Sequence, residues 1–241
     1  MKTKTLKKSP ICLSLIYKSL RVIFRAVFSA VVVTVFCFGA FGCKKSKTDL
    51  FDSVSELRDN VFIAQCDDVY LQIYSIVRET PYLADGVRRE LSRFSEFHIT
   101  APAAYNRVDI SFEINGKRYG GDTSYDNVKS EYFYSCSVDL SNEKSLPVTL
   151  NCGGKEISVS ANSVITENTV APKRALNALY RVEKDKIDGL MDKYGFAGEI
   201  RVRLIYEEAP YYYIGIIEKN GRVSAYLMNA ENEKILARRE S

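Results

Sequence analysis

The chain has 241 residues, of which 46% are hydrophobic and 27% are charged, and both fractions are ordinary for a globular protein. This composition excludes a disordered chain, a collagen-like chain and a membrane protein with several spans. A length of 241 residues suits one or two domains. The aromatic residues are 16 Tyr and 12 Phe with no Trp, and the chain has a single His.

The formal net charge of +4 comes entirely from the first 42 residues. That segment holds seven Lys or Arg and no Asp or Glu, which leaves 27 basic and 30 acidic residues for the rest of the chain. The body of the protein is therefore mildly acidic and shows no basic stripe of the kind that binds phosphates. We predict that nucleic acid is not among its partners.

The segment from Ala26 to Cys43 contains no charged residue. Its length lies between the roughly 7–15 apolar residues of a signal peptide and the ~20 of a membrane-spanning helix. The residues directly before Cys43 are Ala40-Phe41-Gly42, and a polar, lysine-rich run over residues 44–48 follows.

This ending resembles the lipobox of bacterial surface lipoproteins, with Ala40 and Phe41 where the pattern usually has Leu and a small residue. The resemblance implies a cleaved signal peptide over residues 1–42, a lipid (diacylglycerol and palmitate) on the Cys43 thiol, and a tether over residues 43–48. An uncleaved anchor helix is the alternative. In both cases the positive charges before the apolar run keep the N-terminus inside, so the body faces the extracytoplasmic side of the cell membrane.

The body begins with apolar residues at helical spacing, which predict a short helical turn or two within residues 49–60. Apolar and polar residues then alternate as in half-buried strands, around residues 69–77, 110–114, 132–140, 148–152 and 157–159. About seven short strands with turn signals between them predict an antiparallel β-sandwich over residues 49–168, which resembles an immunoglobulin-like module.

Local signals refine this sandwich. Asn115-Gly116 suits the positive backbone angles of a tight hairpin. Asp85 is a plausible helix cap, and Val87, Leu91 and Phe94 share one helical face, so residues 85–94 predict a short helix between strands.

A second region follows Thr169-Val170-Ala171-Pro172, which interrupts the strand pattern and predicts a linker. Residues 175–182 fit either a strand or a helix. Residues 186–194 predict a helix that Asp185 caps and Gly195 ends. Strands are predicted around residues 200–206, 211–218, 223–229 and 235–237, with Asn220-Gly221 as a hairpin turn. The predicted fold class is α+β, mostly β: an antiparallel β-sandwich followed by a small helix-plus-β-meander domain.

The C-terminal part resembles a known type of extracytoplasmic domain. The residues that carry the resemblance are the run Tyr213-Ile214-Gly215-Ile216-Ile217-Glu218-Lys219-Asn220-Gly221-Arg222-Val223 and the tail Asn229-Ala230-Glu231-Asn232-Glu233-Lys234-Ile235-Leu236. They look like the PepSY family, whose tail reads Asp-Ala-x-Thr-Gly-x-Ile-Leu, so Glu233 stands where that family has a turn Gly. The resemblance implies a PepSY-like α+β domain over residues 173–241 that binds a partner or restrains a protease, with no fixed catalytic set.

Few residues suggest a reaction. His98 lies in a predicted strand and is read as structural rather than as a catalytic base. Asp67-Asp68 and the run over residues 120–127 contain oxygen ligands, but turn formation explains them and no calcium-loop spacing is present. We therefore predict no catalytic residue, no metal site and no cofactor.

Three cysteines remain after Cys43, namely Cys66, Cys136 and Cys152. A bridge between Cys136 and Cys152 is one interpretation, and three small buried residues without a bridge is the favoured one.

The most unusual short stretch is Tyr211-Tyr212-Tyr213. Strand alternation places Tyr211 and Tyr213 on one face and Tyr212 on the other. The functional interpretation is an aromatic surface for a peptide or a glycan, and the structural one is that tyrosine suits half-buried strand positions.

We expect a non-catalytic protein of the cell envelope, anchored to the membrane through Cys43, that binds an envelope protein or a cell-wall glycan. One alternative is an envelope hydrolase that uses carboxylates, because 30 acidic residues offer many pairs. The other is a protease-restraining module, which follows from the PepSY resemblance alone.

Overall fold

A computed structural model describes residues 49–66, 69–81, 89–101, 105–193 and 195–241, which form one compact unit. The predicted signal peptide over residues 1–42, the lipid site Cys43 and the tether over residues 43–48 lie outside the described residues. In the part of the chain that is described, no helix combines the length and apolar character needed to cross a membrane.

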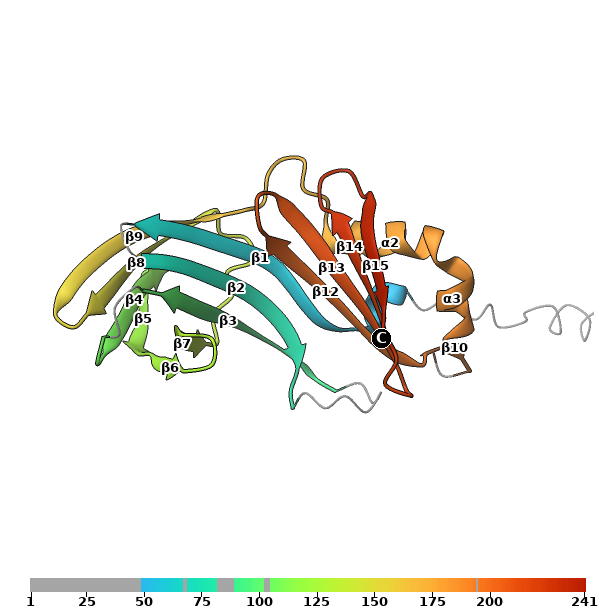
Figure 1. Cartoon of the computed structure of the whole chain (residues 1–241), viewed down its shortest axis with the longest axis horizontal. Coiled ribbons are helices and arrows are strands. Elements are labelled where there is room, and N and C mark those ends of the chain that lie inside the picture. The colour runs from blue at the N-terminus through green and yellow to red at the C-terminus, as the bar shows by residue number, and fades with distance from the viewer. Residues whose placement is uncertain (1–48, 67–68, 82–88, 102–104, 194) are drawn as a thin grey trace, which may run out of the picture. The chain divides into compact units, whose positions relative to one another are not determined.

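The N-terminal part begins with a single 3-10 turn, η1 (Leu50–Ser53), and continues as strands. Their bounds are β1 (Val54–Cys66), β2 (Val69–Glu79), β3 (Leu91–Thr100), β4 (Val108–Ile114), β5 (Lys117–Asp122), β6 (Ser124–Asp126), β7 (Glu131–Cys136), β8 (Ser145–Cys152) and β9 (Lys155–Ser163). The order β1-β2-β3-β7-β6 forms one layer, and β9-β8-β4-β5 forms the other (Figure 1). A short pairing of β1 with β9 joins the two layers at one edge.

A sandwich-like core lies between these two layers. Phe62, Leu71 and Phe97 contribute from the first layer, and Ile110 and Leu150 contribute from the second. All five side chains are at most 2% exposed. Their strands alternate buried and partly exposed residues, which is why the period-two pattern in the sequence predicts them correctly.

The C-terminal part contains two helices and an antiparallel meander. The elements are α2 (Pro172–Val182), α3 (Lys184–Gly189), β10 (Met191–Asp192), β11 (Gly195–Phe196), β12 (Gly198–Tyr206), β13 (Pro210–Glu218), β14 (Val223–Asn229) and β15 (Ile235–Glu240). Helix α2 covers one face of β12–β15 (Figure 1), where Leu176 and Leu179 pack with Val202, Ile214 and other apolar residues. The protein is therefore α+β and mostly β, as the sequence predicts.

One contact unites the two parts in a single sheet. Strand β1 pairs in parallel with β12, so that Leu57 lies opposite Val202 and Arg58 lies opposite Arg203. The predicted boundary at residues 169–173 covers the end of the coil after β9 and the first two residues of α2. Separate folding of residues 49–168 and 173–241 stays a prediction. Strand β1 pairs with strands of both segments, β2 in the first and β12 in the second.

Two segments predicted as helical near the N-terminus contain strand residues instead. Within residues 49–60 only η1 is helical, and β1 starts at Val54. Leu91 and Phe94, predicted at the end of the 85–94 helix, belong to β3, whereas residues 85–88 lie outside the described residues. Apolar residues three or four apart over so short a run carry little information, and pairing with neighbouring strands overrides the local preference.

The predictions for the second region hold in part. Residues 175–182, which fit two structures, are helical within α2 because Pro172 occupies the first turn. Helix α3 starts and ends earlier than predicted, and Met191 already belongs to the two-residue strand β10. The hairpin at Asn115-Gly116 is confirmed, with φ of 53° and 73° at these two residues.

The three cysteines of the described part are free, as the favoured interpretation predicts, but only Cys152 is buried, whereas Cys66 and Cys136 are partly exposed. Cys152 is only 1% exposed. Burial raises the pKa of the Cys136 thiol to about 11, so this thiol is protonated at neutral pH and is a poor nucleophile.

Candidate functional site

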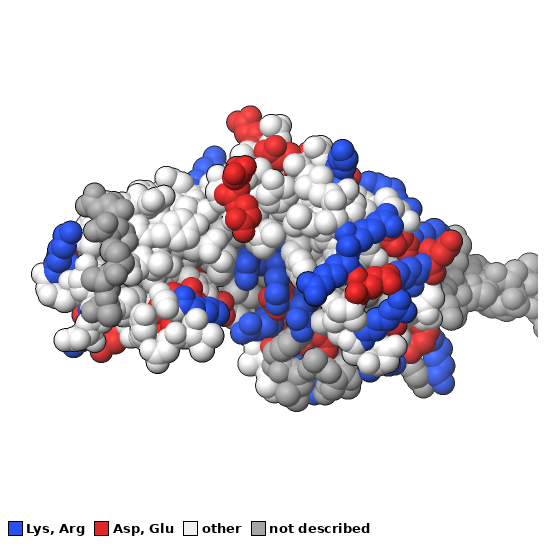
Figure 2. Space-filling model, in the orientation of Figure 1, with Lys and Arg blue, Asp and Glu red and all other residues white. Residues whose placement is uncertain are grey.

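One face of the sheet carries charged and aromatic side chains, most of them at partly exposed positions. Along β3, Phe94, Glu96 and His98 alternate with the buried residues Ser95 and Phe97. We call this surface the open face. Its side chains are Glu56, Arg58, Tyr74, Arg78, Phe94, Glu96, His98, Glu131, Phe133, Glu199, Arg201, Arg203, Tyr211 and Tyr213. Figure 2 shows Lys and Arg side chains gathered in the middle of the view, over the region where Figure 1 places β1, β2 and β12.

A β-bulge in β1 directs Arg58 onto the open face. Arg58 lies opposite Ile76 and Asn60 lies opposite Ser75, so Asp59 is an extra residue in the ladder between β1 and β2. In a regular strand Arg58 and Asn60 would share a face, since they are two residues apart. The bulge sends Arg58 to the open face and Asn60 to the opposite side.

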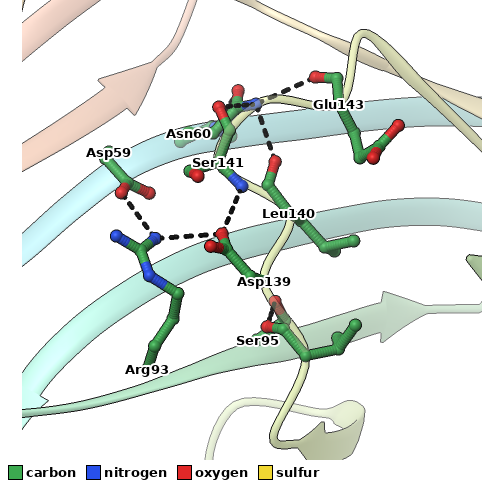
Figure 3. Close-up of polar contacts among 10 residues, drawn as sticks. Asp59, Asn60, Arg93, Ser95, Asp139, Leu140, Ser141 and Glu143 are labelled. Atoms are coloured by element: carbon green, nitrogen blue, oxygen red, sulfur yellow. Dashed lines mark hydrogen bonds and ion pairs between the residues drawn. The ribbon is translucent and has the colours of Figure 1, made fainter. Parts of the chain in front are cut away.

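Polar contacts on the opposite side hold this bulge in place (Figure 3). Asn60 is 1% exposed, and its Nδ2 donates to the carbonyl oxygens of Leu140, Ser141 and Glu143 at 3.2, 3.4 and 3.1 Å. Its Oδ1 accepts from Ser163 Oγ at 2.7 Å. A buried amide with every hydrogen-bonding group engaged fixes the local backbone.

The bulged residue is itself held by an ion pair. Arg93 Nη1 donates to Asp59 Oδ2 at 2.7 Å and to Asp139 Oδ1 at 3.1 Å (Figure 3). The segment that carries Asp139 therefore closes over the bulge from the side opposite the open face.

Arg203 and Glu56 form the tightest ion pair of the open face. The Arg203 Nε and Nη2 atoms each donate to one Glu56 oxygen at 2.7 Å, and Glu56 is 3% exposed. Burial alone would lower the pKa of Arg203, but the hydrogen bonds and the charge of Glu56 outweigh burial and raise it. The Arg203 Cζ atom also lies 6.0 Å from the centre of the Tyr213 ring.

Arg58 has a different environment. Its Cζ atom lies 3.6 Å above the centre of the Tyr74 ring, which is cation–π stacking at close range. Its Nε atom is buried and has no hydrogen-bonding partner in the described part of the chain. Burial lowers the pKa of Arg58, and the charge of Arg203 adds to this effect. Tyr74 and the charges of Glu56 and Glu96 oppose it without outweighing it.

His98 lies at the other end of the open face, between two carboxylates. Its Nδ1 is 2.8 Å from Glu131 Oε1, and its Nε2 is 3.6 Å from Glu96 Oε2, beyond hydrogen-bond reach but close enough for charge attraction. The rings of Tyr74 and Phe133 flank it at 5.1 and 5.3 Å. Burial would lower the pKa of His98, but the two carboxylates outweigh it and raise the pKa.

The predicted tyrosines divide as strand alternation requires. Tyr211 and Tyr213 are partly exposed on the open face, and Tyr213 lies opposite Arg203 in the ladder between β12 and β13. The prediction that Tyr212 belongs to a binding surface is wrong. This residue lies in the core, where it is 1% exposed, and its hydroxyl donates to the Val170 carbonyl at 2.7 Å. The lipid site Cys43 lies outside the described residues.

Searches against protein-family models, curated proteins and solved structures found no match. The lipobox, immunoglobulin-like and PepSY-like resemblances therefore stay proposals. The chemistry of the site has to be argued from its own residues.

The open face suits binding by contact over an extended surface. A groove of about 410 Å³ follows β2, β3 and β7, lined by Arg78, Phe94, Glu96, Phe133 and neighbouring polar residues. Arg78 also contacts both of its neighbours there, with Nη2 at 3.9 Å from Glu96 Oε1 and Cζ at 4.8 Å from the centre of the Phe94 ring. Among the described residues, no three His, Cys, Asp or Glu side chains converge in a way that could hold a metal ion.

Sequence reasoning missed the most informative residues of this face. Arg201 and Arg203 alternate with buried residues along β12, and that alternation was a usable signal. The sequence around Arg58 and Glu56 gave no such signal, because helical turns are predicted over residues 49–60. The side chains also come from strands far apart in the sequence, and no local pattern reports which of these strands become neighbours.

Proposed function

We propose that this protein is an outward-facing, lipid-anchored protein of the cell envelope that binds a partner on its open face without catalysing a reaction. The sequence around Ala40–Cys43 supports the anchor. The observation that supports binding is the row of arginine and aromatic side chains across β13, β12, β1 and β2, in which Arg203 approaches Tyr213 and Arg58 stacks on Tyr74.

Arginine and tyrosine are enriched at protein interfaces because they combine flat contact area with directional hydrogen bonds. On the open face these groups are also held in place before any partner arrives. Glu56 fixes the Arg203 guanidinium by two hydrogen bonds, and the Tyr74 ring supports that of Arg58. Groups fixed in advance lose little conformational entropy on binding, which favours affinity.

The anchor is tested on the N-terminal peptide of the membrane-bound protein by mass spectrometry. A lipid-modified Cys43 as the first residue supports the proposal. The variant Cys43→Ser should leave the membrane fraction, whereas the control Cys66→Ser should stay in it. An unmodified Cys43 in the membrane-bound protein would refute the anchor.

The binding surface is tested by photo-crosslinking in intact cells. A benzophenone amino acid replaces Tyr213 on the open face and, in the matched control, replaces Val128, which is 95% exposed in the turn between β6 and β7. Adducts of defined mass at Tyr213 and none at Val128 support the proposal. Equal labelling at both positions, or none at either, refutes it.

The alternatives remain a carboxylate hydrolase and a protease-restraining module, the latter within a PepSY-like C-terminal domain that follows an immunoglobulin-like one. Inhibition of an envelope protease by the purified chain would favour the restraining module. Turnover of a glycan substrate, lost on replacing one open-face glutamate, would favour the hydrolase.

A further inference from the structure

Arg58 differs from the other arginines of the open face in its counter-charge. Arg203 pairs with Glu56 at 2.7 Å, Arg78 lies 3.9 Å from Glu96, and Arg201 lies 3.8 Å from Glu199. Within the described residues Arg58 has the Tyr74 ring and no carboxylate within ion-pair distance.

The position of Arg58 is unfavourable for the protein on its own. It lies directly opposite Arg203 in the parallel ladder, and like charges placed opposite one another destabilise a sheet. Its Nε–H group is buried without an acceptor, which adds a desolvation cost. An anionic group placed against the Arg58 guanidinium would offset the like-charge pair and give this partly buried positive charge a counter-charge.

This position is also built into the backbone. The bulge at Asp59 is what turns Arg58 onto the open face, and Asn60 locks that bulge with three hydrogen bonds from its amide. Backbone bulges that redirect a single side chain occur next to functional sites. The bulge, the like-charge pair and the missing acceptor are three separate observations at one residue.

The surrounding charges limit the ligand. Four arginines on the open face, residues 58, 78, 201 and 203, face four glutamates, residues 56, 96, 131 and 199, so the local charge is nearly balanced. A polyanion would meet the glutamates as well as the arginines. A phosphate group carries about −1.5 to −2 charges and would be repelled more than a carboxylate with one.

The geometry favours a peptide over a sugar acid. Next to Arg58 the ring face that could stack on a sugar is already occupied, since Arg58 itself covers Tyr74, and further along Arg78 covers Phe94. The guanidinium groups of this surface match the planar geometry of a carboxylate. We propose that Arg58 is the anchor for a single carboxylate of a peptide partner, either an acidic side chain or a C-terminus. This inference rests on the proposed function, because it names the group that the open face binds.

The direct test uses the full chain in detergent micelles, labelled with ¹⁵N-arginine, and follows the Nε–H signal of Arg58, which Arg58→Lys removes and so assigns. The probes are a capped pentapeptide Ala-Ala-Asp-Ala-Ala, its Asn counterpart, glucuronic acid and inorganic phosphate. The Asp peptide should shift this signal saturably, with a dissociation constant on the order of millimolar. The Asn peptide should leave it unchanged.

Three results would overturn the proposal: equal shifts from the Asp and Asn peptides, a larger shift from phosphate or from glucuronic acid, or no shift from any probe. Because the comparison of peptides uses the unmodified protein, it does not depend on whether a variant folds.

A second measurement separates this inference from the proposed function. Crosslinking through position 213 should become at least about tenfold weaker in Arg58→Lys. The control Arg107→Lys alters a surface arginine, 65% exposed and paired with Asp109 and Asp122, and should crosslink as the parent chain does. If crosslinking persists undiminished in Arg58→Lys, the binding function stands and the role of Arg58 is wrong.

Discussion

Leu57 of β1 lies directly opposite Val202 of β12, in the one pair of parallel strands that joins the two parts of the described chain. Close by, Ser55 Oγ donates to the carbonyl of Ile200 at 3.2 Å across 145 residues of sequence. Val202 is fully buried. The backbone groups along the β12 edge of the C-terminal meander are therefore hydrogen-bonded only when β1 is present.

The C-terminal part should accordingly be less stable alone than within the chain. Residues 173–241 by themselves would expose the β12 edge and lose the contact of Val54 with the core around Leu176, at a cost of about 2 kcal/mol or more. Urea unfolding followed by circular dichroism measures this, with the full chain as reference. Equal midpoints would show that β1 adds nothing to the stability of the C-terminal part.

The Tyr212 hydroxyl should matter for stability, unlike those of its neighbours. Tyr212→Phe leaves the Val170 carbonyl without its 2.7 Å hydrogen bond and should lower the free energy of unfolding by about 1–2 kcal/mol. The control is Tyr213→Phe on the open face, which should stay within about 0.5 kcal/mol of the parent. Urea midpoints of the two variants give the comparison, and equal losses would contradict the burial difference.

His98 should make stability depend on pH above its ordinary pKa. Its pKa is raised in the folded protein, because Glu96 and Glu131 together outweigh burial. The stabilisation is therefore complete below the ordinary pKa of 6.5 and is lost as the pH rises through the raised value. The chain has one histidine, so His98→Gln should remove this part of the pH dependence. Unfolding free energies measured from pH 6 to pH 9 test it, and an unchanged slope in the variant would disprove it.

Asn60 should be the most sensitive buried polar position. Asn60→Ala leaves the carbonyls of Leu140, Ser141 and Glu143 without their donor and should cost about 2–3 kcal/mol. Asn60→Asp keeps the shape but turns a carboxylate oxygen toward those carbonyls. It should destabilise the protein at pH 7 and recover in part at pH 4, where the carboxyl begins to protonate. An aspartate variant as stable as the parent at pH 7 would contradict the assigned contacts.

Glu233 occupies a turn where glycine would be easier. Its φ is +61°, and its carboxylate accepts from Arg174 and Arg181, which are 68% and 67% exposed. Both Glu233→Gly and Glu233→Ala lose these surface pairs, which are individually weak. The glycine variant should nevertheless be more stable than the alanine variant by about 1 kcal/mol, because only glycine adopts this angle freely. Thermal unfolding of the two variants provides the test, and equal stability would rule out strain at this turn.

Much of the fold follows from local sequence. The alternation along residues 69–77 and 110–114 predicts β2 and β4, and Asn115-Gly116 predicts the hairpin after β4, because each depends on neighbours a few residues apart. The helical turns predicted over residues 49–60 are confirmed only for η1. The prediction is wrong from Val54 onward, because Val54 and Leu57 gain their partners from β2 and β12. Such long-range partners are invisible to a short window.

The candidate site was harder to predict for a related reason. Strand alternation correctly separates Tyr212 from Tyr211 and Tyr213. The orientation of Arg58 relative to the rest of β1 depends on one inserted residue, Asp59. Past such a bulge, residue spacing assigns each side chain to the wrong face of the sheet. Arg58 and Arg203 are neighbours because β1 pairs in parallel with β12. No turn signal in the sequence predicts this pairing.

The pairing of β1 with β12 also sets an order of events as the chain is made. The ribosome delivers β1 first, and β12 only after the whole sandwich-like part has been synthesised. Until then the first half of β1 presents unpaired N–H and C=O groups along one edge, a template to which another strand can add. Closing so long a loop is slow compared with forming the hairpins on either side of it. Strand β1 is thus synthesised first but is among the last to gain all its strand partners. A chain that stops before β12 keeps an unpaired strand edge, to which other chains can add.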